Sequence, residues 1–218
     1  MLPRSHDELV ARLSGGVTPV VGLRPPLVRL AWWLALQAVT LGSAFLFGLR
    51  EDLALHLHDG RFLLELVAFI AAGSIAGGIA LSAAVPGMTK GRGTLAIPLV
   101  IGAFAFALLS LEPALSGNRS TGRFLFEGMR CVGAIASFSA LPWVALFIAV
   151  RRGAPLDRNY AATCTGAAAL LFAAAAVRIA CPVDDGLHLL FWHTVPISLG
   201  ISLAGTLTAR WLEPLAAD

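Results

Sequence analysis

Three cysteines and two histidines are the side chains in this sequence best suited to chemistry. Cys131 and Cys181 lie at the edges of long apolar segments, Cys164 lies within one, and His188 and His193 follow soon after Cys181. Thiolates form disulfides, undergo oxidation and, together with imidazoles, bind soft or borderline metal ions. No CxxC or HxxxH spacing marks a zinc site, so metal binding stays open, with Cys131, Cys181 and His188 as the candidate ligands.

Six apolar segments are expected to position these side chains. Of the 218 residues, 57% are hydrophobic and 13% are charged, whereas soluble domains are about 25% charged. A membrane-spanning helix needs about 20 apolar residues. The segments that lack Asp, Glu, Lys and Arg and reach or approach this length are Leu30–Leu49, Leu66–Thr89, Gly93–Leu111, Cys131–Val150, Asn159–Val177 and Gly186–Ala209.

The sequence therefore predicts an all-α integral membrane bundle of about six transmembrane helices. It divides into a cytoplasmic N-terminal segment (1–26), a transmembrane domain (27–212) and a short cytoplasmic tail (213–218). Small residues at Gly73-x-x-x-Gly77 and the many alanines of the fifth segment predict close helix packing. A bundle able to rearrange is the alternative to a compact one, because a proline inside a helix removes one backbone hydrogen bond and can kink it. Such prolines lie inside the third, fourth and sixth segments: Pro98, Pro142 and Pro196.

Basic residues predict the orientation in the membrane, because cytoplasmic loops carry an excess of Lys and Arg. With the N-terminus inside, ten of the 16 basic residues fall on the inner side: Arg4, Arg12, Arg24, Arg29, Lys90, Arg92, Arg151, Arg152, Arg158 and Arg210. The other six fall outside: Arg50, Arg61, Arg119, Arg123, Arg130 and Arg178. We therefore expect a multi-pass protein of the bacterial inner membrane with both termini in the cytoplasm. The net charge is +3, but no basic run is present, so no direct contact with nucleic acid is expected.

This topology brings Cys131 and Cys181 to the outer membrane face. From the turn at residues 151–159, each helix rises over roughly 20 residues, or about 30 Å. Disulfides persist on that side of a bacterial inner membrane. The pair is therefore a static disulfide, a redox- or metal-responsive pair, or two unpaired thiols. Cys164 lies about 25 Å from Cys181 along the helix, too far for a disulfide, and is expected to be a packing residue.

Two other polar side chains near this face carry expectations. His188 and His193 are five residues apart, so on an α-helix they point about 140° apart and should not join one site. His193 is instead expected to make a hydrogen bond between helices. Glu65, one residue before the second segment, is expected to reach the outer surface, and a buried, functional carboxylate is the alternative.

Motifs of the common enzyme classes are absent from the sequence, including G-x-S-x-G, H-E-x-x-H and the P-loop. A transporter needs polar groups near the middle of its spans, but only Gln37 and a few hydroxyls are available. We therefore expect no enzymatic activity and no cofactor. A protein of the cell envelope that binds or transports a metal or redox ligand stays the alternative to a regulator.

The N-terminal segment is the longest cytoplasmic piece. Ser5-x-x-Glu8 is a capping-box pattern that predicts a short helix over residues 6–14. Its apolar face has Leu9, Val10 and Leu13, and Arg24-Pro25-Pro26 predicts an extended connector to the membrane. The helix rests on the membrane surface or docks into a groove of a cytosolic partner.

Motifs along the chain resemble those of the NrsF family of membrane proteins, the negative regulators of sigma F. In chain order they are Glu8-Leu9-Val10-x-Arg12-Leu13, Pro19-Val20, Leu23-Arg24-Pro25-Pro26, Arg29, Val85-Pro86-Gly87, Arg130-Cys131, Arg151-Arg152-Gly153-Ala154-Pro155, Cys181-Pro182, Trp192-His193 and Arg210-Trp211.

This resemblance implies an anti-sigma factor that holds an extracytoplasmic-function sigma factor at the inner membrane. It also implies release of the sigma factor under stress from heavy metals or oxidants, with Cys131 and Cys181 as the sensing pair. The contact with the sigma factor is then expected in the N-terminal segment, with these candidate residues: Leu9, Val10, Arg12, Leu13 and Arg24.

Overall fold

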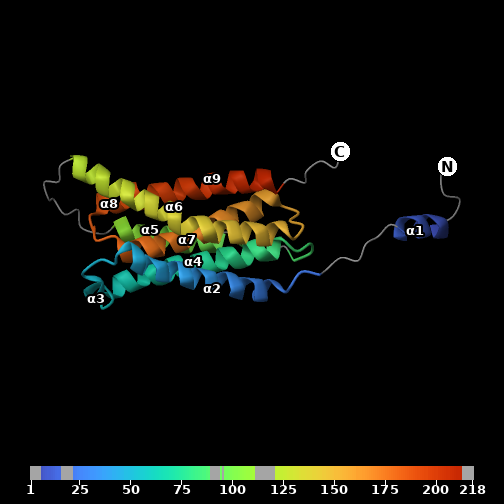
Figure 1. The fold of residues 1–218 in the computed structure, drawn as a ribbon, viewed down its shortest axis with the longest axis horizontal. Helices are drawn as coiled ribbons and strands as arrows, with labels where there is room; N and C mark the ends of the chain where they lie inside the picture. Colours follow the sequence, from blue (N-terminus) through green and yellow to red (C-terminus); the bar gives the residue numbers. More distant parts are fainter. Residues whose placement is uncertain (1–5, 16–21, 89–93, 95, 111–120, 213–218) are drawn as a thin grey trace.

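The computed structural model describes residues 6–15, 22–88, 94, 96–110 and 121–212, and this part of the chain is all-helical, without a strand. The predicted all-α class is thereby confirmed. Figure 1 shows an elongated bundle whose main helices run along one axis. They are α2 (Pro26–Phe47), α4 (Gly60–Ala83), α5 (Ala96–Ser110), α6 (Thr121–Arg151), α7 (Arg158–Ala180) and α9 (Val195–Trp211).

Shorter helices complete the described fold. The N-terminal helix α1 (His6–Ser14) forms where the capping box predicts it, and Figure 1 draws it apart from the bundle. Helix α3 (Leu53–His56) lies between α2 and α4. Helix α8 (Gly186–Leu189) and the π-helix η2 (Leu190–Thr194) continue without a break into α9.

Five helices are long and apolar enough to cross a membrane: α2, α4, α6, α7 and the continuous run Gly186–Trp211. Each predicted apolar segment corresponds to one main helix. Helix α5 is apolar but has only 15 residues, which makes it about 22 Å long against a hydrocarbon core of about 30 Å. The structure therefore supports five candidate spans, and a sixth span stays a prediction.

Helix α7 forms the centre of the bundle, and 94% of its most apolar window is buried. Its alanines allow neighbouring helices to approach closely. A Cβ atom placed on Gly73 of α4 would lie 2.7 Å from the Phe172 ring, and one on Gly77 would lie 2.9 Å from Trp33 of α2. The close packing predicted for Gly73-x-x-x-Gly77 is confirmed.

The three prolines lie in different settings. Pro98 lies in the first turn of α5, where a missing N–H breaks no hydrogen bond of the helix. Pro142 lies inside α6, and its carbonyl oxygen accepts a hydrogen bond of 3.0 Å from Trp33 Nε1. Pro196 lies two residues after the end of η2, within the continuous run Gly186–Trp211. Only Pro142 and Pro196 therefore interrupt a continuous helix.

The bundle has two distinct ends (Figure 1). We call the end where α2 begins and α9 ends the terminal end, because the chain enters and leaves the bundle there. The turn between α6 and α7 lies at the same end, where Ala154 N donates a hydrogen bond of 2.9 Å to Ala84 O. The opposite end, which has α3, α8 and the start of α6, is the site end.

Candidate functional site

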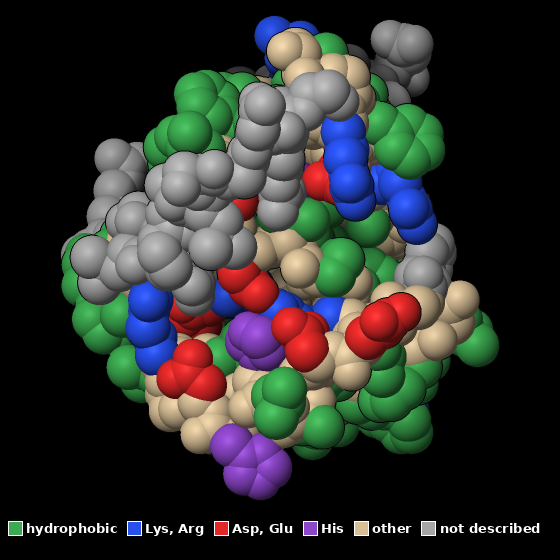
Figure 2. Space-filling model, turned by 90° about the vertical axis from the view of Figure 1, so that its left-hand side faces the viewer, with side chains coloured by type: hydrophobic (Ala, Val, Ile, Leu, Met, Phe, Trp, Pro, Cys, Tyr) green, Lys and Arg blue, Asp and Glu red, His purple; other side chains and the backbone are tan. Residues whose placement is uncertain are grey.

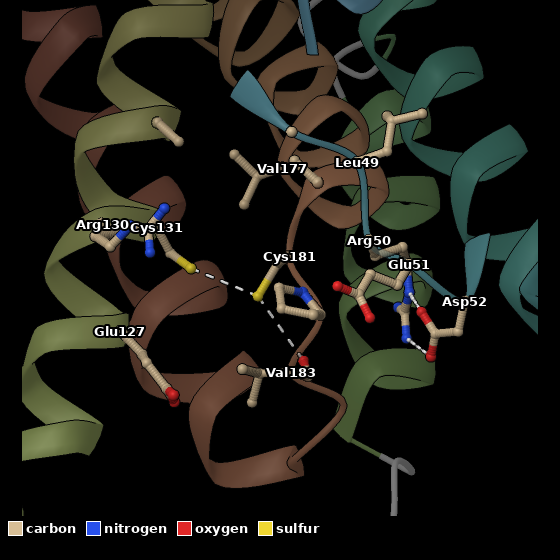
Figure 3. A pocket seen from close by; sticks show the side chains of 14 residues that line it. Leu49, Arg50, Glu51, Asp52, Glu127, Arg130, Cys131, Val177, Cys181 and Val183 are labelled. Atoms are coloured by element: carbon tan, nitrogen blue, oxygen red, sulfur yellow. Dashed lines mark hydrogen bonds and ion pairs between the residues drawn. The ribbon is translucent and has the colours of Figure 1, made fainter. Parts of the chain in front are cut away.

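The two thiols that the helical hairpin predicts to be neighbours lie together near the site end. Cys131 comes from α6 and Cys181 from the loop directly after α7, and their sulfur atoms are 3.5 Å apart without a covalent bond. Figure 3 shows the two side chains pointing toward each other. Both are buried, with 8% and 5% of their surface exposed. Cys164 is buried within α7 and takes no part in this site.

Both histidines join the two thiols. His188 Nε2 lies 3.5 Å from Cys131 Sγ and 3.6 Å from Cys181 Sγ. One ligand atom from each of Cys131, Cys181, His188 and His193 lies within 4.8 Å of the other three, and both histidines are buried. The expectation that His188 and His193 point to different sides is therefore wrong.

The π-helix η2 explains this correction. A π-helix closes its hydrogen bonds between residues five apart, so that such residues lie nearly one above the other. The backbone N–H of Val195 accordingly bonds to the carbonyl oxygen of Leu190. Pro196 lacks an N–H group, and its ring would clash with the carbonyl four residues earlier in a regular α-helix. The proline therefore favours the wider turn that places His193 above His188.

Aromatic rings pack beside the imidazole of His188, and one glycine allows their approach. Phe124 of α6 packs against His188 and Trp192, with ring centroids 6.2 and 5.7 Å apart. A Cβ atom on Gly128 would lie 2.1 Å from the Trp192 indole, so any larger residue would displace this ring. No local sequence pattern marks Gly128, because its role depends on a contact between α6 and η2.

A charge cluster lies beside the thiols. Arg50, Glu65 and Arg178 are its buried members, and Asp52 and Asp184 are its partly exposed ones. Arg178 lies 3.1 Å from Glu65 and 2.5 Å from Asp184, and Arg50 lies 2.6 Å from Asp52 and also pairs with Asp184. Figure 2 looks onto this end and shows acidic, basic and histidine side chains gathered there.

The expectation that Glu65 reaches the outer surface is wrong, because this side chain is fully buried. Burying a carboxylate is costly unless a cation pairs with it. Arg178 supplies that cation from α7, and Arg61 lies 3.8 Å from Glu65 one helical turn earlier. The sequence contains the opposite charges but does not reveal that α4 and α7 bring them together.

The surroundings shift the pKa values of groups in the loops at this end. Burial alone would raise the pKa of Asp184, but hydrogen bonds from Arg50 and Arg178 outweigh it and hold the pKa below its ordinary value. The pKa of Cys181 is also lowered, because Cys131 donates a hydrogen bond to its sulfur and His188 and His193 add to this stabilisation against the effect of burial.

One short loop joins the thiols to the charge cluster. Cys181 begins it, Asp184 binds Arg50 and Arg178, and the Asp185 side chain accepts a hydrogen bond of 2.9 Å from Leu187 N at the start of α8. A cavity of about 610 Å³ opens beside this loop (Figure 3). Its lining includes both thiols and the charged side chains Arg50, Glu51, Asp52, Glu127 and Arg130. The thiols thus line a cavity that also has charged side chains in its wall.

The residues predicted to bind a partner lie elsewhere. Leu9, Val10 and Leu13 of α1 are 38%, 60% and 67% exposed, and Arg12 and Arg24 are exposed too. The connector from α1 leads into α2 at the terminal end, while the thiols lie near the site end. The candidate sensing residues and the candidate partner-binding residues are therefore separated by the length of the bundle.

These features define a helical membrane protein with a buried thiol–imidazole site near one end and an exposed amphipathic helix before its first long helix. The chain belongs to the NrsF family, described as negative regulator of sigma F, whose family model matches residues 13–213. Membership implies negative regulation of a sigma factor, which is therefore the expected partner. The match covers all four residues of the thiol–imidazole site but only the last part of α1. No curated protein and no solved structure matches the chain.

Proposed function

We propose that this protein is a membrane anti-sigma factor that holds an extracytoplasmic-function sigma factor at the bacterial inner membrane. It releases the sigma factor when an oxidant or a heavy-metal ion acts on Cys131 and Cys181, and it has no enzymatic activity. The observation that carries this proposal is the approach of two buried thiols from different elements, 3.5 Å apart, in a member of a family of negative sigma regulators.

The proposed topology has six spans, with both termini in the cytoplasm and the site end on the outer side. The surroundings of the basic residues support this orientation. At the site end, Arg50 and Arg178 are buried in the charge cluster, so they serve the fold. At the terminal end, no ion pair is found within the described residues for Arg29, Arg151, Arg152, Arg158 and Arg210. An excess of such residues is typical of the cytoplasmic side.

The thiol pair can transmit a signal because its two cysteines belong to different elements. Oxidation removes two electrons and two protons from the thiols and draws the sulfurs from 3.5 Å to about 2.05 Å. This change moves α6 relative to the loop that follows α7. Helices α6 and α7 are also joined by the turn at the terminal end. This turn faces the cytosol in the proposed topology. A tenfold shift in the population of the releasing state requires about 1.4 kcal/mol of differential free energy.

Helix α1 is the proposed contact with the sigma factor. Leu9, Val10 and Leu13 are exposed in the absence of a partner, and full burial of such a side chain contributes about 1.5–3 kcal/mol. A short amphipathic helix that places its apolar face in a groove is a common mode of recognition. Arg12 and Arg24 would add charged contacts at the edge of that groove.

The sensing role is tested with serine variants of the three cysteines. Cys131→Ser and Cys181→Ser should each abolish or lock the response, and the double variant should resemble the single ones because the residues act as a pair. Cys164→Ser, which changes a buried thiol away from the site, is the matched control and should respond normally. The measurement is sigma-dependent transcription before and after metal or oxidant, with the membrane level of each variant. Normal induction in the double variant would contradict the sensing role.

The partner contact is tested by co-purification of the sigma factor from membranes. Leu9→Asp combined with Leu13→Asp should release the sigma factor and leave the protein in the membrane. Ala11→Asp adds one negative charge to the opposite face of α1 and should retain the sigma factor. Retention by the double variant would place the contact outside α1. If the unmodified protein retains no sigma factor, the alternative of an envelope metal or redox protein is favoured.

A further inference from the structure

We infer that Cys131, Cys181, His188 and His193 form a closed four-coordinate site for one divalent transition-metal ion of the Zn²⁺ class. The role of such an ion as part of the signal input rests on the proposed function. The binding itself does not, because it follows from the chemistry and geometry of these four residues.

The separations of the ligand atoms fit a tetrahedral ion. With bonds of about 2.3 Å to sulfur and about 2.0–2.1 Å to nitrogen, a tetrahedral ion places two sulfurs about 3.8 Å apart and a sulfur and a nitrogen about 3.5 Å apart. The observed separations are 3.5 Å between the sulfurs and 3.5 and 3.6 Å from His188 Nε2 to Cys131 and Cys181. For these three ligand atoms, binding therefore requires shifts of only a few tenths of an ångström, and the His193 ligand atom lies within 4.8 Å of all three.

The ligand types select the metal. A tetrahedral set of two thiolates and two imidazoles is typical of Zn²⁺, whereas Mg²⁺ and Ca²⁺ prefer oxygen ligands. Binding converts the two thiols to thiolates, so any proton still on either sulfur is released, and the double positive charge of the ion balances the two thiolates. Four protein ligands leave no open position for a substrate, as in structural zinc sites.

The π-helix η2 supplies the fourth ligand. On a regular α-helix His193 would point away from His188, and only three ligands would meet. Single π-turns within α-helices occur frequently at functional sites. The site thus combines one ligand from α6, one from the loop after α7 and two from the run α8–η2. Bound metal would link these three elements.

Burial and hydrogen bonding also favour ligand roles for the imidazoles. His188 and His193 are 0% and 2% exposed, yet His188 Nδ1 and His193 Nε2 have no hydrogen-bond partner in the described part of the chain. Buried polar atoms in native proteins are nearly always paired. For His188, the argument for a ligand role is the direction of its ring, because Nε2 faces both sulfurs. The cavity beside Cys131 and Cys181 provides an entry path for an ion.

Binding is tested on the purified full-length protein in detergent, first freed of metal and then titrated with Co²⁺ as a spectroscopic probe. We expect one Co²⁺ per chain, visible ligand-field bands of tetrahedral intensity, near-ultraviolet sulfur-to-cobalt charge transfer, and displacement by Zn²⁺. His188→Gln and His193→Asn should each weaken Co²⁺ binding at least about 100-fold. Loss of a residue that only supports a metal ligand costs about 10–100-fold in affinity, and loss of a ligand should cost more. His58→Gln, at an exposed histidine, and Cys164→Ser are the matched controls and should bind as the unmodified protein does.

Thermal unfolding without metal shows whether each variant is folded. If the folded His193→Asn protein binds Co²⁺ as tightly as the control, or if the spectrum lacks charge transfer from sulfur, the inference is wrong. If no metal binds but the cysteine variants still block induction, the proposed function stands without this site. If Co²⁺ binds with the expected spectrum but the cysteine double variant responds normally, the metal site stands and the sensing role is refuted.

Discussion

Replacement of Arg178 by methionine should destabilise the bundle strongly. Arg178 is among the largest fully buried side chains, and it pairs with Glu65 at 3.1 Å and Asp184 at 2.5 Å. Methionine keeps an apolar stem beside the Phe62 ring, over which the guanidinium now lies at 5.1 Å. The substitution therefore removes mainly the charge, and it leaves the Glu65 carboxylate buried without its α7 partner.

Removal of one partner from a buried ion pair typically costs about 3–5 kcal/mol. We expect about 3 kcal/mol, at the lower end of that range, because Arg61 still lies beside Glu65 and Arg50 still binds Asp184. The double variant Glu65→Gln, Arg178→Met should recover part of the loss, since it leaves no buried carboxylate on α4 and thereby couples the two substitutions.

The assay is reversible unfolding in mixed micelles with increasing mole fraction of a denaturing detergent. Arg123→Met is the matched control, because Arg123 pairs with Glu127 on the same helix and its side chain is 73% exposed. Loss of such a surface pair should cost about 0.5 kcal/mol or less. A cost for Arg178→Met no larger than that of the control, or strictly additive costs in the double variant, would refute the reasoning.

Three further predictions follow from the same structure. Gly128→Ala should cost about 1–3 kcal/mol in the same unfolding assay, because its Cβ would overlap Trp192, whereas Gly133→Ala meets nothing within 4 Å and should be neutral or stabilising. Reporter fusions after Leu115 should read outside and fusions after Gly153 inside; the opposite result at either point would overturn the topology. Because the pKa of Asp184 is lowered in the folded state, its contribution to stability should be present above about pH 4 and be lost as the pH falls further; thermal unfolding of Asp184→Asn should show a weaker acid dependence, and an unchanged profile would contradict this.

The sequence predicted the helices well because membrane spans have a strong signal. Long charge-free segments must form helices in lipid, since every backbone polar group has to be paired within its own segment. The short helix α1 was also predicted at its observed bounds, because its capping box and apolar spacing are local features. The start of α6 at Thr121 was missed, since Arg123 and Glu127 interrupt the apolar pattern while pairing with each other one turn apart.

The charge cluster was beyond the reach of sequence analysis for a different reason. Arg178 and Glu65 are 113 residues apart and pair only because α4 packs against α7. The rule that ionisable groups at a membrane edge extend toward water assumes that no partner is near. Here a cation from the neighbouring helix supplies the pairing that water would otherwise provide, and the carboxylate stays buried.

The error over the histidines has a local cause, and it changes the view of the site. A constant turn of 100° per residue separates His188 from His193, but Pro196 lies only three residues after His193 and prevents regular α-helical hydrogen bonding there. A histidine pair spaced by five and followed by a proline is therefore a sequence signal for a π-turn that aligns both rings.

With both rings aligned, the thiols no longer form an isolated pair. They become part of a four-residue site, and the loop that holds Cys181 also holds Asp184 against Arg50 and Arg178. Only two residues separate Cys181 from Asp184, so we expect a ligand or an oxidation that shifts Cys181 to act on the charge cluster as well.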